Sequence, residues 1–329
     1  MSAKNLLFLS ESDIKSAISM REIIDLMRIA FRQISEEIVS IPLRTKLDIS
    51  KYDAGALFMP AHSAESNLIS LKVVTEYKNN PKYKLPLIQA LVLLLDGENG
   101  KPLAVMDAEY LTALRTGAAS GLATELLARP NADTLGIIGA GVQSRTQLSA
   151  VSEVRTLKKL IIIDKNPDAA KSLAEYAKND LQLNVEVAYP TTQLSECDII
   201  CTATTSPVPV FTDSDLKTGV HINAVGAYQP DKREIPGDTI KRSKVIVDQR
   251  SACLEEAGDL IIPINEKLIK PDHIYAELGE IVIGKKPGRS DEYEITVFKS
   301  VGIAAQDLIA AGTIYKKARE AGLGASISL

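Results

Sequence analysis

The strongest pattern of apolar and polar positions along the chain is a short apolar run that ends in glycines and continues as a helix. Residues 135–144 read Leu-Gly-Ile-Ile-Gly-Ala-Gly-Val-Gln-Ser, which predicts a buried strand, a tight turn and a helix. Gly139 permits the turn, and Gly141, which has no side chain, lets the backbone approach a pyrophosphate closely. The helix that begins near Val142 points its unpaired N–H groups at that phosphate. Ser144 stands where such loops carry a third glycine.

A second apolar run, residues 160–163, ends at Asp164. In dinucleotide-binding folds an acidic residue at this strand end binds the two ribose hydroxyls of the adenosine. The alternative is a turn residue of the kind that ends strands in many doubly wound sheets. A carboxylate here repels a 2′-phosphate, so Asp164 favours NAD(H), whereas the adjacent Lys165 leaves NADP(H) open.

The alternation of strands and helices then continues. Further buried strands are predicted at residues 185–187, 199–202, 221–226 and 245–248. Together they predict a doubly wound parallel sheet of the Rossmann type, which binds ligands outside the carboxyl ends of its strands. Residues 202–205 and 224–228 are therefore candidate cofactor contacts.

The first third of the chain has a different pattern. A capping box at Ser19 and Glu22 starts a helix with apolar residues at helical spacing, and residues 44–106 then read as strands. Asn99-Gly100 predicts a hairpin within a mostly antiparallel sheet. A long helix at about 108–128 follows. This pattern predicts a separate α+β module.

The end of the chain is predicted to return to that first module. A closing helix at about 302–321 has apolar positions that suit packing on the N-terminal sheet. We therefore predict two domains, a discontinuous one of residues 1–115 plus 304–329 and a dinucleotide-binding one of residues 116–303.

Composition and charge narrow the function classes. The 329 residues are 45% hydrophobic and 24% charged, as in an ordinary globular protein, and the net charge of −4 with no basic block argues against nucleic acid. Three cysteines without metal-ligand spacing predict no metal site and fit a reducing compartment. No signal-peptide layout and no apolar run long enough for a bilayer is found, so we expect a cytoplasmic protein that does not contact membranes.

Three cations stand out as candidates for chemistry, because no serine triad, zinc motif or Walker loop is found. Lys72 interrupts an apolar strand, where it either extends from an edge strand to solvent or donates to a substrate carboxylate or imine. Arg115 lies among small residues of a predicted helix. It either forms an ion pair between the domains or binds a carboxylate or phosphate through two parallel hydrogen bonds. Arg44 opens a strand, where a surface position is the default.

Seven short segments resemble one family over nearly the whole chain, the ornithine cyclodeaminase/mu-crystallin family. The segments are 59–61 (Met-Pro-Ala), 71–72 (Leu-Lys), 102–107 (Pro-Leu-Ala-Val-Met-Asp), 114–119 (Leu-Arg-Thr-Gly-Ala-Ala), 139–143 (Gly-Ala-Gly-Val-Gln), 223–227 (Asn-Ala-Val-Gly-Ala) and 296–300 (Thr-Val-Phe-Lys-Ser). The resemblance implies a homodimer that pairs through the N-terminal sheet module, and an active site in the cleft between that module and the Rossmann domain.

The resemblance also implies roles for individual residues. It places the substrate carboxylate among Arg44, Lys72 and Arg115, with Met59, Lys299 and Ser300 as further substrate contacts. The cofactor residues that it implies are Arg115, Thr116, Gly139, Ala140, Gly141, Val142, Gln143, Asp164, Lys165, Thr202, Ala203, Thr204, Val225, Gly226 and Ala227.

Two positions separate the branches of the family. Tyr228 and Lys299 stand where the cyclodeaminases carry aspartates, and the Gly-Ala-x-x-Pro and Phe-Lys-Ser motifs resemble the ketimine reductase branch. We therefore expect NAD(P)H-dependent reduction of Δ1-pyrroline-2-carboxylate or Δ1-piperideine-2-carboxylate to proline or pipecolate. Lys72 and Arg115 are the expected catalytic residues, with Tyr228 beside the imine. We expect a cluster of cations with no carboxylate at hand for amine chemistry.

Three alternatives stay open: an ornithine cyclodeaminase, an alanine-type amino-acid dehydrogenase, and a non-enzymatic binding protein of the mu-crystallin kind. A carboxylate that holds the δ-amine of ornithine would favour the first. Ammonia-dependent NADH consumption would favour the second, and cofactor binding without turnover the third.

Overall fold

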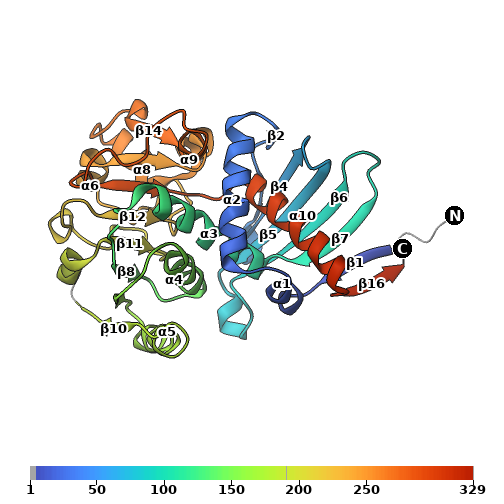
Figure 1. The fold of residues 1–329 in the computed structure, drawn as a ribbon, viewed down its shortest axis with the longest axis horizontal. Helices are drawn as coiled ribbons and strands as arrows, with labels where there is room; N and C mark the ends of the chain where they lie inside the picture. The colour runs from blue at the N-terminus through green and yellow to red at the C-terminus, as the bar shows by residue number, and fades with distance from the viewer. Residues whose placement is uncertain (1–4, 190, 329) are drawn as a thin grey trace. The chain divides into compact units, whose positions relative to one another are not determined.

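Two units, each built on its own eight-stranded sheet, make up the fold (Figure 1). The computed structural model of the protein describes residues 5–189 and 191–328. Unit 1 contains residues 1–115 and 303–329, and unit 2 contains residues 116–302. Helix α3, Glu109–Leu127, begins in the first unit and ends in the second.

The sheet of unit 1 has the order β16-β1-β7-β6-β5-β4-β2, with β3 paired to β4. Its pairs are antiparallel except for β1 with β7. Its strands are β1 (Asn5–Leu9), β2 (Val39–Ser40), β3 (Thr45–Ile49), β4 (Ala54–Ser63), β5 (Leu68–Tyr77), β6 (Ile88–Asp96), β7 (Pro102–Asp107) and β16 (Ala325–Ser328). Its helices besides α3 are α1 (Glu11–Ala17), α2 (Met20–Ser35) and α10 (Ala304–Ala321).

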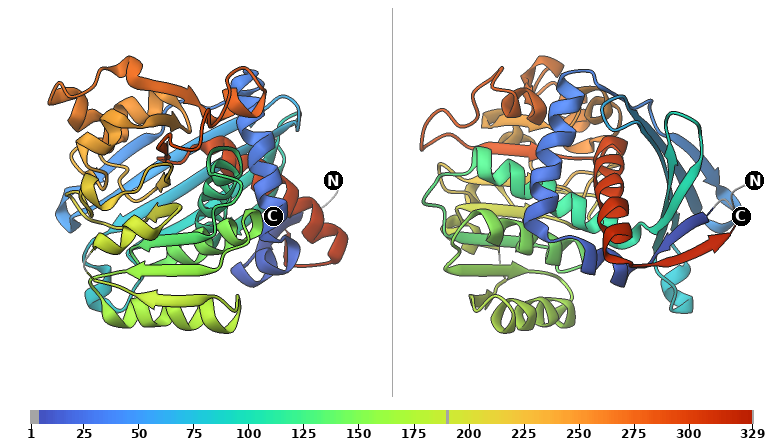
Figure 2. Two further views of the ribbon diagram at one scale, coloured as in Figure 1. Left: turned by 60° about the vertical axis from the view of Figure 1, so that its left-hand side comes forward. Right: turned by 45° about the vertical axis from the view of Figure 1, so that its right-hand side comes forward.

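The two faces of this sheet differ. Helices α2 and α10 lie side by side, and α10 packs on β4, β5 and β6 (Figure 2). Lys72 on β5 pairs with Met59 and Val92, and all three are buried on one face. The neighbouring pair, Val73 with Leu91, points to the opposite face of the sheet, where Leu91 is 44% exposed. Because β5 is an interior strand, the interpretation of Lys72 as an edge-strand residue is wrong.

Unit 2 confirms the predicted doubly wound parallel sheet. Its strand order is β10-β9-β8-β11-β12-β15-β13-β14, and every pair is parallel. The strands are β8 (Thr134–Ile138), β9 (Lys159–Ile163), β10 (Asn184–Val187), β11 (Ile199–Thr202), β12 (His221–Ala224), β13 (Lys244–Val247), β14 (Ile274–Glu277) and β15 (Thr296–Lys299). The helices are α4 (Val142–Val154), α5 (Pro167–Asn179), α6 (Gly237–Arg242), α7 (Arg250–Glu256), α8 (Gly258–Asn265) and α9 (Leu278–Val282).

The chain order reverses beside β8, because β9 lies on one side of β8 and β11 on the other. This switch point is where open α/β sheets bind ligands, outside the carboxyl ends of the strands. A buried apolar cluster holds α4 and α5 against this part of the sheet, through Leu148, Val151 and Leu173 on Ile137 and Ile162. Strand β15 was not predicted from the sequence, because a run of four residues with two apolar side chains does not distinguish strand from helix.

Two kinds of functional element are absent from the described parts of the chain. Among residues 5–189 and 191–328, no helix is both long and apolar enough to cross a membrane. In the same ranges no group of three His, Cys, Asp or Glu side chains is arranged to hold a metal ion. Cys197, Cys201 and Cys253 are all buried free thiols.

Candidate active site

The glycine turn of unit 2 has the geometry that a pyrophosphate requires. Gly139 has φ +92°, and a Cβ there would lie 2.6 Å from the carbonyl oxygen of Ala203, so only glycine fits. A Cβ on Gly141 would meet no atom within 4 Å, which leaves open space beside the backbone. Gly141 is the N-cap of α4 and supplies no side chain to bind the helix N–H groups. These groups can therefore bind a phosphate.

Two side chains hold this turn in place. The hydroxyl of Ser144 donates to the carbonyl of Gly139, so the residue in the third-glycine position fastens the turn. The half-buried Asp164 accepts one hydrogen bond from the Ala140 N–H and one from the Asn166 N–H. A carboxylate has about four acceptor sites, so Asp164 can still bind ribose hydroxyls. The neighbouring Lys165 is exposed.

A buried carboxylate joins the loops that follow β11 and β12. Glu234 is 0% exposed, and its Oε2 accepts from the Thr202 hydroxyl at 2.9 Å and the Gly226 N–H at 2.8 Å. Its Oε1 accepts from the Thr204 N–H at 2.6 Å. Sequence analysis missed Glu234, since a single acid in a polar loop carries no periodic signal.

Lys299, which the resemblance implies as a substrate contact, has partners inside unit 2. Its side chain is 0% exposed, its Nζ lies 2.7 Å from Oδ2 of Asp259, and it donates to the carbonyl of Ala227. Asp259 in turn accepts from the N–H groups of Glu234 and Ile235. Burial lowers the pKa of Lys299, but Asp259 and Glu234 outweigh it and raise that pKa overall. With two carboxylates beside it, Lys299 has no excess charge for a ligand.

Ser300 is also committed within unit 2. Its hydroxyl donates to Oδ2 of Asp248 at 2.8 Å, and the same oxygen accepts from the N–H groups of Val301 and Gly302. The Ser300 hydroxyl can still accept a hydrogen bond, so its role as a substrate contact stays a prediction. Tyr228 is half-buried in the loop after β12, which Lys299 holds at Ala227.

Unit 1 brings Lys72 and Arg115 together around an aspartate that sequence analysis missed. The Nζ of Lys72 lies 2.7 Å from Oδ2 of Asp307, and the Nε of Arg115 lies 3.2 Å from Oδ1. Lys72 is 1% exposed, Arg115 5% and Asp307 0%. The expectation of a cationic cluster with no carboxylate at hand is wrong. The ion pair of Arg115 also lies within unit 1 and is not an interdomain one.

The cluster nevertheless keeps an excess of positive charge. Burial lowers the pKa of Lys72 to about 8, Asp307 opposes this shift, and Arg115 and Arg44 add to it. One carboxylate therefore faces two buried cations, with Arg44 near enough to act on Lys72. A buried charge without a counterion is costly, so this cluster favours an anionic ligand.

An amide beside Arg115 strengthens this conclusion. The Oε1 of Gln306 accepts from Nη1 of Arg115 at 2.9 Å and from the Ile303 N–H at 3.4 Å. These two donors fix which end of the amide is oxygen, so its Nε2 faces away from them. Within the described residues this buried Nε2 has no hydrogen-bond partner. A carboxylate ligand would accept from it.

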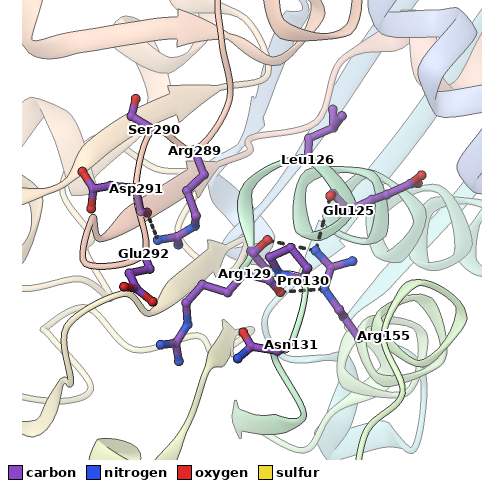
Figure 3. Close-up of a pocket in the computed structure, with 11 residues that line it drawn as sticks. Glu125, Leu126, Arg129, Pro130, Asn131, Arg155, Arg289, Ser290, Asp291 and Glu292 are labelled. Atoms are coloured by element: carbon purple, nitrogen blue, oxygen red, sulfur yellow. Dashed lines mark hydrogen bonds between the residues drawn. The ribbon is translucent and has the colours of Figure 1, made fainter.

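A pocket of about 600 Å³ lies elsewhere in unit 2 and does not serve this chemistry (Figure 3). Three arginines line it, near the amino ends of β8, β11 and β15, whereas the cofactor loops follow the carboxyl ends. Arg155 donates to the carbonyls of Thr124, Ala128 and Arg129, and Arg289 donates to that of Leu127. These guanidinium groups cap the C-terminus of α3, and a cation at that end is stabilising.

Comparisons with known proteins agree with this arrangement. The family model described as the ornithine cyclodeaminase/mu-crystallin family matches residues 4–322. A Δ1-pyrroline-2-carboxylate reductase of Bacillus cereus is 40% identical over 324 residues, which cover 98% of this chain and 99% of the relative.

Solved structures lead to the same family. The Δ1-pyrroline-2-carboxylate reductase of Thermococcus litoralis, in complex with NADH and L-proline, has a TM-score of 0.95 and 43% identity, covering 98% of this chain and 100% of that one. An archaeal alanine dehydrogenase dimer with bound NAD has a TM-score of 0.93 and 34% identity, covering 99% of both chains. The chain therefore belongs to the ornithine cyclodeaminase/mu-crystallin family.

Proposed function

We propose that the protein reduces a cyclic imino acid, Δ1-pyrroline-2-carboxylate or Δ1-piperideine-2-carboxylate, to proline or pipecolate with NADH. The observation that carries this proposal is the buried cluster of unit 1, where Lys72 and Arg115 share one aspartate and the Gln306 amide lacks an acceptor. The named activities of the Bacillus and Thermococcus relatives, at 40% and 43% identity, support the same reaction class.

The residues of unit 2 fit a dinucleotide. Gly139 to Val142 would hold the pyrophosphate, because Gly141 leaves open space beside the first turn of α4. Asp164 would bind the adenosine ribose and disfavour a 2′-phosphate, and NADP(H) remains the second choice because Lys165 is near. When bound, NADH supplies a hydride to the carbon of the substrate C=N bond.

The cations of unit 1 would bind and orient the substrate. Arg115 presents a planar guanidinium to the carboxylate, with Gln306 and Arg44 as further donors. Reduction also requires one proton on the imine nitrogen. Lys72, with a pKa of about 8, can hold that proton at neutral pH and release it readily. Met59 lies opposite Lys72 in the β4–β5 pair and gives the site an apolar side.

We also propose a homodimer that pairs through the open face of the unit 1 sheet. That face exposes Phe8, Leu47 and Leu91 at 46%, 52% and 44%. Apolar surface of this kind on a sheet marks an interface in soluble proteins. The archaeal alanine dehydrogenase is described as a dimer. We place the activity in the cytoplasm, which suits three free, buried cysteines.

Steady-state oxidation of NADH with each imine tests the proposed reaction. We expect turnover with at least one imine without added ammonia. Ammonia-dependent turnover of pyruvate alone would instead identify an amino-acid dehydrogenase, and release of ammonia from ornithine without imine reduction would identify a cyclodeaminase. Asp307 does not favour the latter, because Lys72 and Arg115 already engage both of its oxygens. NADH binding without any turnover would favour the binding-protein alternative.

A further inference from the structure

We propose that Glu234 is a positioning residue for the nicotinamide half of the cofactor, an inference that rests on the dinucleotide binding in the proposed function. Within the described residues, the hydrogen bonds of the Glu234 side chain do not include the glycine turn at 139–142. Its side chain instead binds the two loops that follow β11 and β12, next to the switch point of the sheet. In a doubly wound fold these loops lie beyond the carboxyl ends of the strands, where the ligand binds.

The carboxylate gathers three donors that would otherwise be unpaired. These are the Thr202 hydroxyl, the Thr204 N–H and the Gly226 N–H, at 2.9, 2.6 and 2.8 Å. A Cβ on Gly226 would lie 2.5 Å from both carboxylate oxygens, so the loop is shaped around Glu234. Three donors on two oxygens are the arrangement of an ionised carboxylate.

The neighbouring charges act on that ionised form in both directions. Burial, followed by the charge of Asp259, raises the pKa of Glu234, while Lys299 and the Thr204 bonds oppose the shift. Lys299 pairs with Asp259, whose other oxygen accepts from the backbone N–H of Glu234. Lys299 also donates to Ala227, the residue after Gly226. Lys299 and Asp259 thus link the loop after β12 to the backbone of Glu234.

The peptide geometry shows what this arrangement presents to a ligand. In a trans peptide the N–H and the preceding carbonyl point in opposite directions. Because the Gly226 N–H points at Glu234, the Val225 carbonyl points away from it. The Val225 N–H is already bonded to the Thr202 carbonyl. The Val225 carbonyl is therefore an outward acceptor, suited to the carboxamide N–H of a nicotinamide.

Glu234→Gln in the full-length protein tests this inference. A glutamine places an amide N–H₂ against backbone N–H groups, so the loops should shift. We expect the Kd for NADH to rise about tenfold, the cost of a lost charged hydrogen bond. The Kd for ADP-ribose, which lacks the nicotinamide, should change less than about twofold. Glu266→Gln is the matched control, because Glu266 pairs with Arg233 beside Glu234 but is exposed.

The outcomes separate positioning from a merely structural role. Equal loss of affinity for NADH and ADP-ribose, or no change in either, overturns the inference. If Glu234→Gln does not fold, Thr202→Val removes one donor from the buried contact and should weaken NADH about threefold with ADP-ribose unchanged. The affinities for NADH and ADP-ribose are measured without an imine, so this test does not depend on the proposed reaction. A protein that binds NADH but does not reduce an imine would contradict the proposed reaction and leave the inference about Glu234 open to the same test.

Discussion

Asp307 lies 2.7 Å from the ammonium of Lys72 and 3.2 Å from Nε of Arg115, and all three side chains are buried. One carboxylate therefore aligns two cations from different elements, Lys72 on β5 and Arg115 on α3. Its own negative charge neutralises only one of them. The cluster is held rigidly and still attracts an anion, which is what orientation of a small carboxylate substrate requires.

Asp307→Asn should shift the pH dependence of imine reduction. Burial lowers the pKa of Lys72 to about 8 although the charge of Asp307 opposes this shift, so removing that charge lowers the pKa further. If the Lys72 ammonium is required, activity falls as pH rises through this pKa. The alkaline limb of kcat/KM should then move to lower pH, with a loss of about tenfold at pH 7.5.

Glu320→Gln on the same helix is the control for this variant, because Glu320 is exposed. Both variants are assayed with one imine, so the ionisation of the substrate is common to both profiles. An unchanged alkaline limb in Asp307→Asn would show that Asp307 does not set the protonation of Lys72.

Arg115→Lys keeps the charge but loses the planar fork. The guanidinium bonds Asp307 through Nε and Gln306 through Nη1, which leaves its remaining N–H groups for the substrate. A lysine cannot reproduce this geometry. We expect KM for the imino acid to rise at least about tenfold, and by more than the Kd for NADH measured by fluorescence titration. A variant with wild-type KM would remove Arg115 from substrate binding.

Asp164→Ser should relax the preference between cofactors. The Asp164 carboxylate stands at the end of β9 beside the exposed Lys165, and its charge disfavours a 2′-phosphate. Serine keeps an acceptor for the Ala140 N–H and removes the charge. The ratio of kcat/KM for NADPH over NADH should rise about tenfold or more. Asp168→Ser, on the first turn of α5, is the control and should leave the ratio unchanged.

Leu91→Asp should dissociate the proposed homodimer. It places a charge on the open face of the unit 1 sheet, in the central strand β6, where Leu91 is 44% exposed. Burying that charge between two copies is unfavourable, so light scattering should report a monomer. Val187→Asp is the matched control, because Val187 is 54% exposed on β10 of unit 2. A wild-type mass for Leu91→Asp would place the interface elsewhere.

The local chemistry could be predicted from the amino-acid sequence alone. The glycine turn at 139–141, the acid at Asp164 and the strand pattern around them depend only on residues within a few positions, so they could be predicted. Family membership also followed from short contiguous segments. Lys72 and Arg115 were recognised because a charge in an apolar run is visible in one dimension.

Which charged side chains pair with one another depends on how the chain folds in three dimensions. Asp307 is 192 positions from Arg115, and Glu234 is 32 positions from Thr202, so no local pattern connects them. For the same reason Lys299, whose motif suggested a substrate contact, proved to be the counterion of Asp259. Desolvation and ion pairing act between residues that are neighbours in space. They determine whether a buried charge is neutralised by another side chain of the protein or remains available to bind a ligand.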